Sequence, residues 1–133
     1  MRPLPAAHRR TLLAKRATVF MMHRFYDPAW GVPRSEFDDV CDPQEVRTAL
    51  RMLKRQGCRF VSLLQLCHEL LRGEAPVGAV AFTLDDGYIH QAEIAGPILD
   101  EFHSPVTTFL TTGLVEGTLR IRLDKVGDVV CRT

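Results

Sequence analysis

The chain has 133 residues, of which 46% are hydrophobic and 25% charged, and its formal net charge is +1. This length suits one modest domain, and this balance is ordinary for a globular protein. The near-neutral charge excludes an overall field that would attract nucleic acid or an anionic membrane surface, so we expect neither partner.

Residues 1–16 form a basic lead-in to the domain, which we expect to span residues 17–133. We interpret the lead-in as a solvated segment, with an anion-binding arm as the alternative; its basic residues are Arg2, His8, Arg9, Arg10, Lys15 and Arg16. Its apolar run, 11–14, is too short for a secretion signal, and no small-residue cleavage site follows. No apolar stretch approaches the ~20 residues of a transmembrane helix.

The four cysteines form no CxxC pair and no zinc-binding spacing; they are Cys41, Cys58, Cys67 and Cys131. Such a pattern favours free thiols in a reduced compartment. We therefore expect a cytoplasmic protein, with three of the cysteines acting as small hydrophobic residues on helices or strands.

Predicted strands and helices alternate after the lead-in. In order they are a strand over 17–22, a loop over 26–41, a helix over 43–56, a strand over 59–61, a helix over 63–71, a strand over 77–84, a helix over 89–102, a strand over 106–110 and a last helix over 123–131. Asp42 and Ser62 begin the first two helices as capping residues, and Pro97 predicts a kink or an early break in the third. The alternation predicts an α/β fold with about four parallel strands joined by right-handed crossover helices.

The strand over 77–84 leads into the most informative segment, Asp85-Asp86-Gly87-Tyr88. Alternate strand residues face opposite sides, so Val80, Phe82 and Leu84 share one face and Ala81, Thr83 and Asp85 the other. Acids at the carboxyl end of a buried strand lie where α/β proteins place their chemistry. Two adjacent carboxylates are costly to bury unless a cation or hydrogen-bond donors offset their repulsion. The alternative is that Asp86 caps the next helix and Asp85 is solvated.

Other polar residues end neighbouring strands. His23 follows the first strand and Thr111 follows the fourth. In a parallel sheet these ends meet at one edge, so both residues, together with Tyr88, are candidates to line a site around Asp85. Taken singly, His23 also fits a hydrogen-bonded structural histidine, and Thr111 a turn or helix cap.

Some further polar residues are expected to be solvated. They are His90 and His103, on or beside the helix after the acids, and the pair Asp38-Asp39 in the long loop, for which a capping role is the alternative.

Several segments together resemble the polysaccharide deacetylase family (carbohydrate esterase family four). Residues 82–88, Phe-Thr-Leu-Asp-Asp-Gly-Tyr, resemble its T-F-D-D-G motif. Residues 21–24, Met-Met-His-Arg, resemble M-Y-H-R, and residues 57–63 resemble G-Y-R-F-V-S-L. Residues 95–99 and 105–110 resemble A-x-P-I-L and P-A-T-F-F. The resemblance runs from about residue 17 to the end of the chain.

This resemblance implies a distorted (β/α) barrel, of which the chain would be the amino-terminal part. It also implies a hydrolase that removes acetyl groups from an acetylated carbohydrate with a divalent metal, usually zinc. Asp85 would be the catalytic general base and Asp86 a metal ligand, with His23, Tyr88 and Thr111 lining the site.

The sequence departs from the family pattern in two ways. Leu84 replaces the phenylalanine of the motif, and the family's H-[ST]-x-x-H motif, with its metal-ligand histidines, does not occur before Thr133. We therefore expect an incomplete, inactive site and an exposed strand edge that allows self-association. A non-enzymatic interaction module is the alternative. A haloacid-dehalogenase-like phosphatase is a weaker one, because that class needs D-x-D-G with one residue between the acids.

Overall fold

The computed structural model describes residues 16–27, 29, 40–74 and 76–119. Several predicted features lie outside these residues: nearly all of the basic lead-in, the pair Asp38-Asp39, Cys131 and the helix over 123–131.

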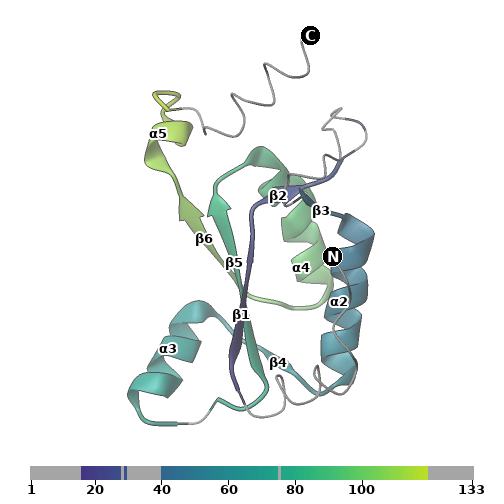
Figure 1. The fold of residues 1–133 in the computed structure, drawn as a ribbon, viewed down its shortest axis with the longest axis vertical. Helices are drawn as coiled ribbons and strands as arrows, with labels where there is room; N and C mark the ends of the chain where they lie inside the picture. Colours follow the sequence, from purple (N-terminus) through teal and green to yellow (C-terminus); the bar gives the residue numbers. More distant parts are fainter. Residues whose placement is uncertain (1–15, 28, 30–39, 75, 120–133) are drawn as a thin grey trace.

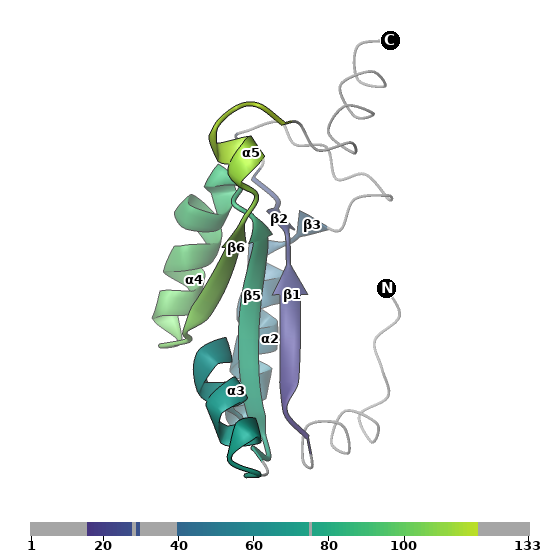
Figure 2. The ribbon, with the colours of Figure 1, turned by 90° about the vertical axis from the view of Figure 1, so that its left-hand side faces the viewer.

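The described residues form a four-stranded parallel sheet centred on β5 (Ala79–Asp86). Strand β1 (Thr18–Met22) pairs along one side of β5. The other side is shared by β4 (Arg59–Phe60) near the beginning of β5 and by β6 (Val106–Leu110) near its end. Figure 2 shows β1 and β6 on either side of β5. The α/β class and the four parallel strands are thus confirmed.

Helices cover the two faces of the sheet unequally (Figure 1). On one side lie α2 (Pro43–Arg55), the π-helix η2 (Gln91–Ala95) and α4 (Gly96–Glu101), and on the other lies α3 (Leu63–Leu71). The larger core cluster forms under α2 and α4, and it includes Leu50, Leu53, Val80, Phe82, Leu84, Ile98 and Leu99. A second cluster, against α3, holds Val61, Leu66, Ala79 and Ala81. The predicted alternation of faces along β5 is therefore confirmed.

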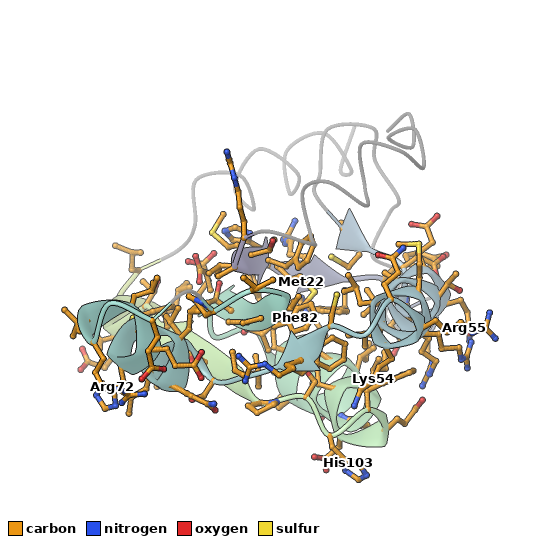
Figure 3. All side chains as sticks on the ribbon, turned by 90° about the horizontal axis from the view of Figure 1, so that it is seen from below. Met22, Lys54, Arg55, Arg72, Phe82 and His103 are labelled. Carbon is orange, nitrogen blue, oxygen red and sulfur yellow. The ribbon has the colours of Figure 1, made fainter. Side chains whose placement is uncertain are left out.

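Capping fixes where α2 and α3 begin. The Asp42 side chain accepts hydrogen bonds from the backbone N–H groups of Gln44 and Glu45, and Ser62 accepts one from Gln65. These bonds satisfy donors that a helix leaves free at its start. Figure 3 shows Met22 and Phe82 in the middle of the molecule and His103 at its periphery, where that histidine is exposed as predicted.

The prediction of a loop over 26–41 is wrong for its last two residues, which form a strand. Strand β3 (Val40–Cys41) pairs in parallel with β2 (Arg24–Phe25). Phe25 is fully buried, so its backbone polar groups need partners inside the protein. The neighbouring Tyr26 N–H donates to the Cys41 carbonyl at 2.9 Å, which continues the same pairing.

The segment predicted as one helix over 89–102 has a wider π-helical turn before α4, where the Gly96 N–H bonds to the Gln91 carbonyl. Pro97 lies in the first turn of α4. Because its ring would clash with the carbonyl four residues earlier in a regular helix, the widening precedes it. The prediction of a disturbed helix is right, but the disturbance comes before the proline.

Three smaller features differ from the predictions. Strand β5 continues through Asp86, because its last two residues pair with Phe109 and Leu110 of β6. The short helix α5 (Thr112–Val115) was not predicted. Cys58 is buried as expected, whereas Cys67 is exposed on α3.

The sheet face that α3 leaves uncovered is apolar and open. By the strand register, Val19, Met21 and Phe109 share this face with Thr83. Their exposed fractions are 47%, 61% and 52%. No strand pairs with the outer edges of β1 and β6 in the part of the chain that the structure describes. The predicted exposed edges and apolar face are present there. No helix among the described residues has the length and apolar character needed to cross a membrane.

Candidate functional site

The acidic pair ends β5 in a sharp turn. Asp86 and Gly87 have positive φ angles of 78° and 81°. Aspartate tolerates this left-handed conformation better than most residues, and glycine adopts it freely. A Cβ atom on Gly87 would lie 2.7 Å from Leu110 Cδ2 of the neighbouring strand. The glycine therefore permits both the turn and the close approach of β6 to the acids.

Asp85 lies beside His23, as the parallel sheet predicts. The His23 Nε2 and Asp85 Oδ2 atoms are 3.9 Å apart, and the two side chains are 36% and 28% exposed. This distance is too long for a direct hydrogen bond and allows only an electrostatic attraction. The other carboxylate oxygen, Asp85 Oδ1, is buried without a hydrogen-bond partner. A buried acceptor of this kind calls for a polar partner, such as a water molecule or a cation.

Asp86 is held by Thr111 from the end of β6. The Thr111 hydroxyl donates to Asp86 Oδ1 at 3.1 Å. Thr111 stands at the cap position of α5, but its side chain makes no capping bond there. Thr111 is therefore the cap residue of α5 through its backbone carbonyl, while its hydroxyl is directed to the acid.

Tyr88 belongs to an aromatic stack beside the pair. Its ring lies 5.0 Å from that of His90 at an interplanar angle of 14°, and the Arg24 guanidinium lies 5.2 Å from the tyrosine ring centre. The prediction that His90 is solvated is wrong, because His90 is only 7% exposed and its Nδ1 accepts the Phe25 N–H at 3.3 Å. Tyr88 thus lies near the site through packing against a buried histidine.

Gln91 is a residue of the site that the sequence reasoning missed. Its Nε2 donates to the backbone carbonyls of both His23 and Asp85. A glutamine in a predicted helix carries no signal for such a role, although it follows Asp86 by only five residues.

Two hollows in the described surface lie away from the acidic pair. One, of about 370 Å³, is lined by Arg51, Lys54, Arg55, Glu101, Phe102 and His103. Another, of about 390 Å³, is lined by Gln44, Glu45, Thr48, Ala49 and Met52. Neither of these two hollows includes a residue of the acidic pair or its contacts.

The donor set at this edge is not a complete metal site. No group of three or more histidine, cysteine, aspartate or glutamate side chains suited to a metal occurs among the residues the structure describes. Catalytic zinc sites normally use three protein ligands. The described residues alone therefore do not provide enough ligands for a zinc ion. Asp85 Oδ1 has no hydrogen-bond partner and could accept a bond from a further polar group.

Comparison with known proteins gives matches among solved structures. No protein-family model and no curated protein matches the chain. The deacetylase PplD of Streptococcus pyogenes, determined in complex with acetate, matches with a TM-score of 0.63 and 25% identity over 76% of this chain. A de-N-acetylase from Aggregatibacter actinomycetemcomitans matches with a TM-score of 0.57 and 25% identity over 70%. IcaB from Ammonifex degensii matches with a TM-score of 0.58 and 26% identity over 72%.

The fold and the strand-end acids define a partial α/β domain of the barrel type found in deacetylases. The matched proteins are polysaccharide deacetylases, and the described residues share the fold of part of these proteins, as the sequence resemblance predicts. The chain spans 45%, 36% and 38% of the lengths of the three matched chains.

Proposed function

We propose that the chain contributes to a metal-dependent hydrolase that removes acetyl groups from a carbohydrate by breaking a carbon–nitrogen bond other than a peptide bond. One observation carries this proposal. Asp85 lies beside His23 with one buried, unpartnered carboxylate oxygen, at the strand edge of a fold shared with deacetylases.

The chemistry assigned to these residues is general-base hydrolysis. The Asp85 carboxylate accepts a proton from a water molecule, whose oxygen attacks the acetyl carbonyl carbon. Collapse of the tetrahedral species breaks the carbon–nitrogen bond and yields acetate and an amine. The leaving nitrogen takes up the proton that Asp85 accepted, as the bond breaks.

Metal dependence, with zinc as the preferred ion, is part of the proposal. Asp86 would contribute one carboxylate ligand, oriented by the Thr111 hydroxyl. Hydrogen bonds to a metal ligand typically fix its orientation in this way. Because the described donors do not complete a zinc site, the remaining ligands would come from residues outside the described set.

Acetate release from an N-acetylated chito-oligosaccharide tests this function. We expect none from the 133-residue chain alone, because its described ligand set is incomplete. Joined to the remaining part of the barrel of the Streptococcus deacetylase, the chain should release acetate. Asp85→Asn should abolish the release, whereas Asp100→Asn, an exposed acid on α4, should preserve it.

One outcome would contradict the expected incompleteness of the site, and another would contradict the function. Release by the 133-residue chain alone, abolished by Asp85→Asn, would show that the site is not incomplete. A folded chimera that releases no acetate in the presence of zinc would count against the deacetylase function itself.

An interaction module is the second candidate, because the open face exposes Val19, Met21 and Phe109. Its most direct form is self-association through the edges of β1 and β6. The deacetylase fold gives no support to a haloacid-dehalogenase-like phosphatase. The cytoplasmic location and the domain bounds at residues 17–133 stay predictions from the sequence.

A further inference from the structure

One buried side chain ties together the two strand ends that carry the candidate catalytic pair. Gln91 is 4% exposed. Its Nε2 donates to the His23 carbonyl at 2.6 Å and to the Asp85 carbonyl at 2.5 Å. A side-chain amide has two N–H hydrogens, so it can serve one carbonyl with each.

The two carbonyls lie where the pairing of β1 with β5 has stopped. The last paired residues of the two strands are Met22 and Leu84, and His23 and Asp85 follow directly. A bond to the carbonyl of each residue restrains the backbone from which its side chain projects. The Gln91 side chain therefore provides hydrogen bonds, the Gln91 bridge, to the two strand ends just beyond the last backbone pairing, beside the His23 and Asp85 side chains.

The local helix geometry supports this role. Gln91 is the first residue of η2. Such π-helical turns are rare in proteins, but those that occur are frequently at functional sites. The preceding residue, His90, accepts the Phe25 N–H at 3.3 Å. Consecutive residues of one helix thus hold the backbone at both His23 and Phe25. Gln91 Oε1 is also buried without a hydrogen-bond partner, an energetic cost that favours a role beyond packing.

We propose that Gln91 is a positioning residue that sets the separation of His23 and Asp85. At 3.9 Å the pair attracts without a direct hydrogen bond, which leaves the Asp85 oxygens available for water. The meaning of this separation for catalysis rests on the proposed function. The separation itself can be measured without turnover.

The bridge can be observed directly by NMR in the full chain labelled with ¹³C and ¹⁵N. Scalar couplings across hydrogen bonds are expected from Gln91 Nε2 to the carbonyl carbons of His23 and Asp85. Absence of both couplings in a folded sample would overturn the proposal, and this measurement needs no variant.

The positioning role is tested by how the Asp85 carboxylate carbon responds to His23→Gln. We expect a clear shift of that resonance in the otherwise unsubstituted chain and at least a twofold smaller shift in the Gln91→Met background. Gln91→Asn, which keeps the amide but is one methylene shorter, provides a second variant with the same expected loss. Gln65→Met is the matched control, because it removes an amide that bonds to Glu69 on α3.

Loss of stability alone would lower the melting temperature without changing the response of the folded state. An undiminished response in folded Gln91→Met or Gln91→Asn would therefore overturn the positioning role. A failure of acetate release with an intact bridge would count against the proposed function and leave this inference standing.

Discussion

Gly87→Ala probes the turn that follows the acidic pair. At a φ of 81° an L-residue pays about 1–2 kcal/mol relative to glycine. The reduced freedom of the unfolded chain offsets about 0.4–1 kcal/mol of this cost. The new Cβ would also lie 2.7 Å from Leu110 Cδ2, the end of a side chain that is 59% exposed. Moving that side chain from its preferred rotamer costs about 0.5–1.5 kcal/mol.

These terms give a loss of about 1–2 kcal/mol in the free energy of unfolding for Gly87→Ala. Gly57→Ala is the matched control, because its φ is 77° and nothing lies within 4 Å of its Cβ position. Gly57→Ala should therefore lower the free energy of unfolding by about 1 kcal/mol less than Gly87→Ala does. For a chain of 133 residues that difference corresponds to about 3–4 °C in melting temperature.

Thermal unfolding followed by circular dichroism measures both variants. In a Leu110→Ala background, Gly87→Ala should lower the free energy of unfolding by about as much as Gly57→Ala does. The contact between the new Cβ and Leu110 is then gone. Equal losses for Gly87→Ala and Gly57→Ala would refute the reasoning that β6 packs against this turn.

Three other predictions follow from the same structure. Asp86→Asn should raise the melting temperature at pH 7, because it removes one of two adjacent negative charges. The asparagine tolerates a positive φ, and its side-chain oxygen can still accept the hydrogen bond from the Thr111 hydroxyl. A lower melting temperature would contradict this. Hydrogen bonds from the Arg47 guanidinium lower the pKa of Glu101 from its usual 4.5, so the pair stabilises the fold fully above about pH 4.5 and loses its effect as the pH falls through the lowered pKa. Arg47→Gln should flatten that acid dependence in urea unfolding, and an unchanged slope would rule the pair out as its cause. Phe109→Lys should weaken self-association in sedimentation velocity, and an unaltered concentration dependence would remove β6 from the contact.

The sequence by itself determined the elements whose causes are local. Capping side chains at Asp42 and Ser62 begin the helices, because their oxygens serve N–H groups only two or three residues away. The alternation of faces from Val80 to Asp85 predicted a buried strand over 77–84, and the residues at its end carried both acids to the edge of the sheet. The order of strands and helices then implied parallel pairing, which brought His23 near Asp85.

Only the tertiary structure decided which polar side chains serve the site. The Thr111 hydroxyl could cap α5 or bond to Asp86, 25 residues away, and the register of β6 settled the choice. His90 and Gln91 bind backbone groups 65 and 68 residues distant. A backbone N–H or carbonyl has no sequence signature, so such partners cannot be identified from residue types. Their selection depends on where the π-helical turn directs each side chain once the sheet has assembled.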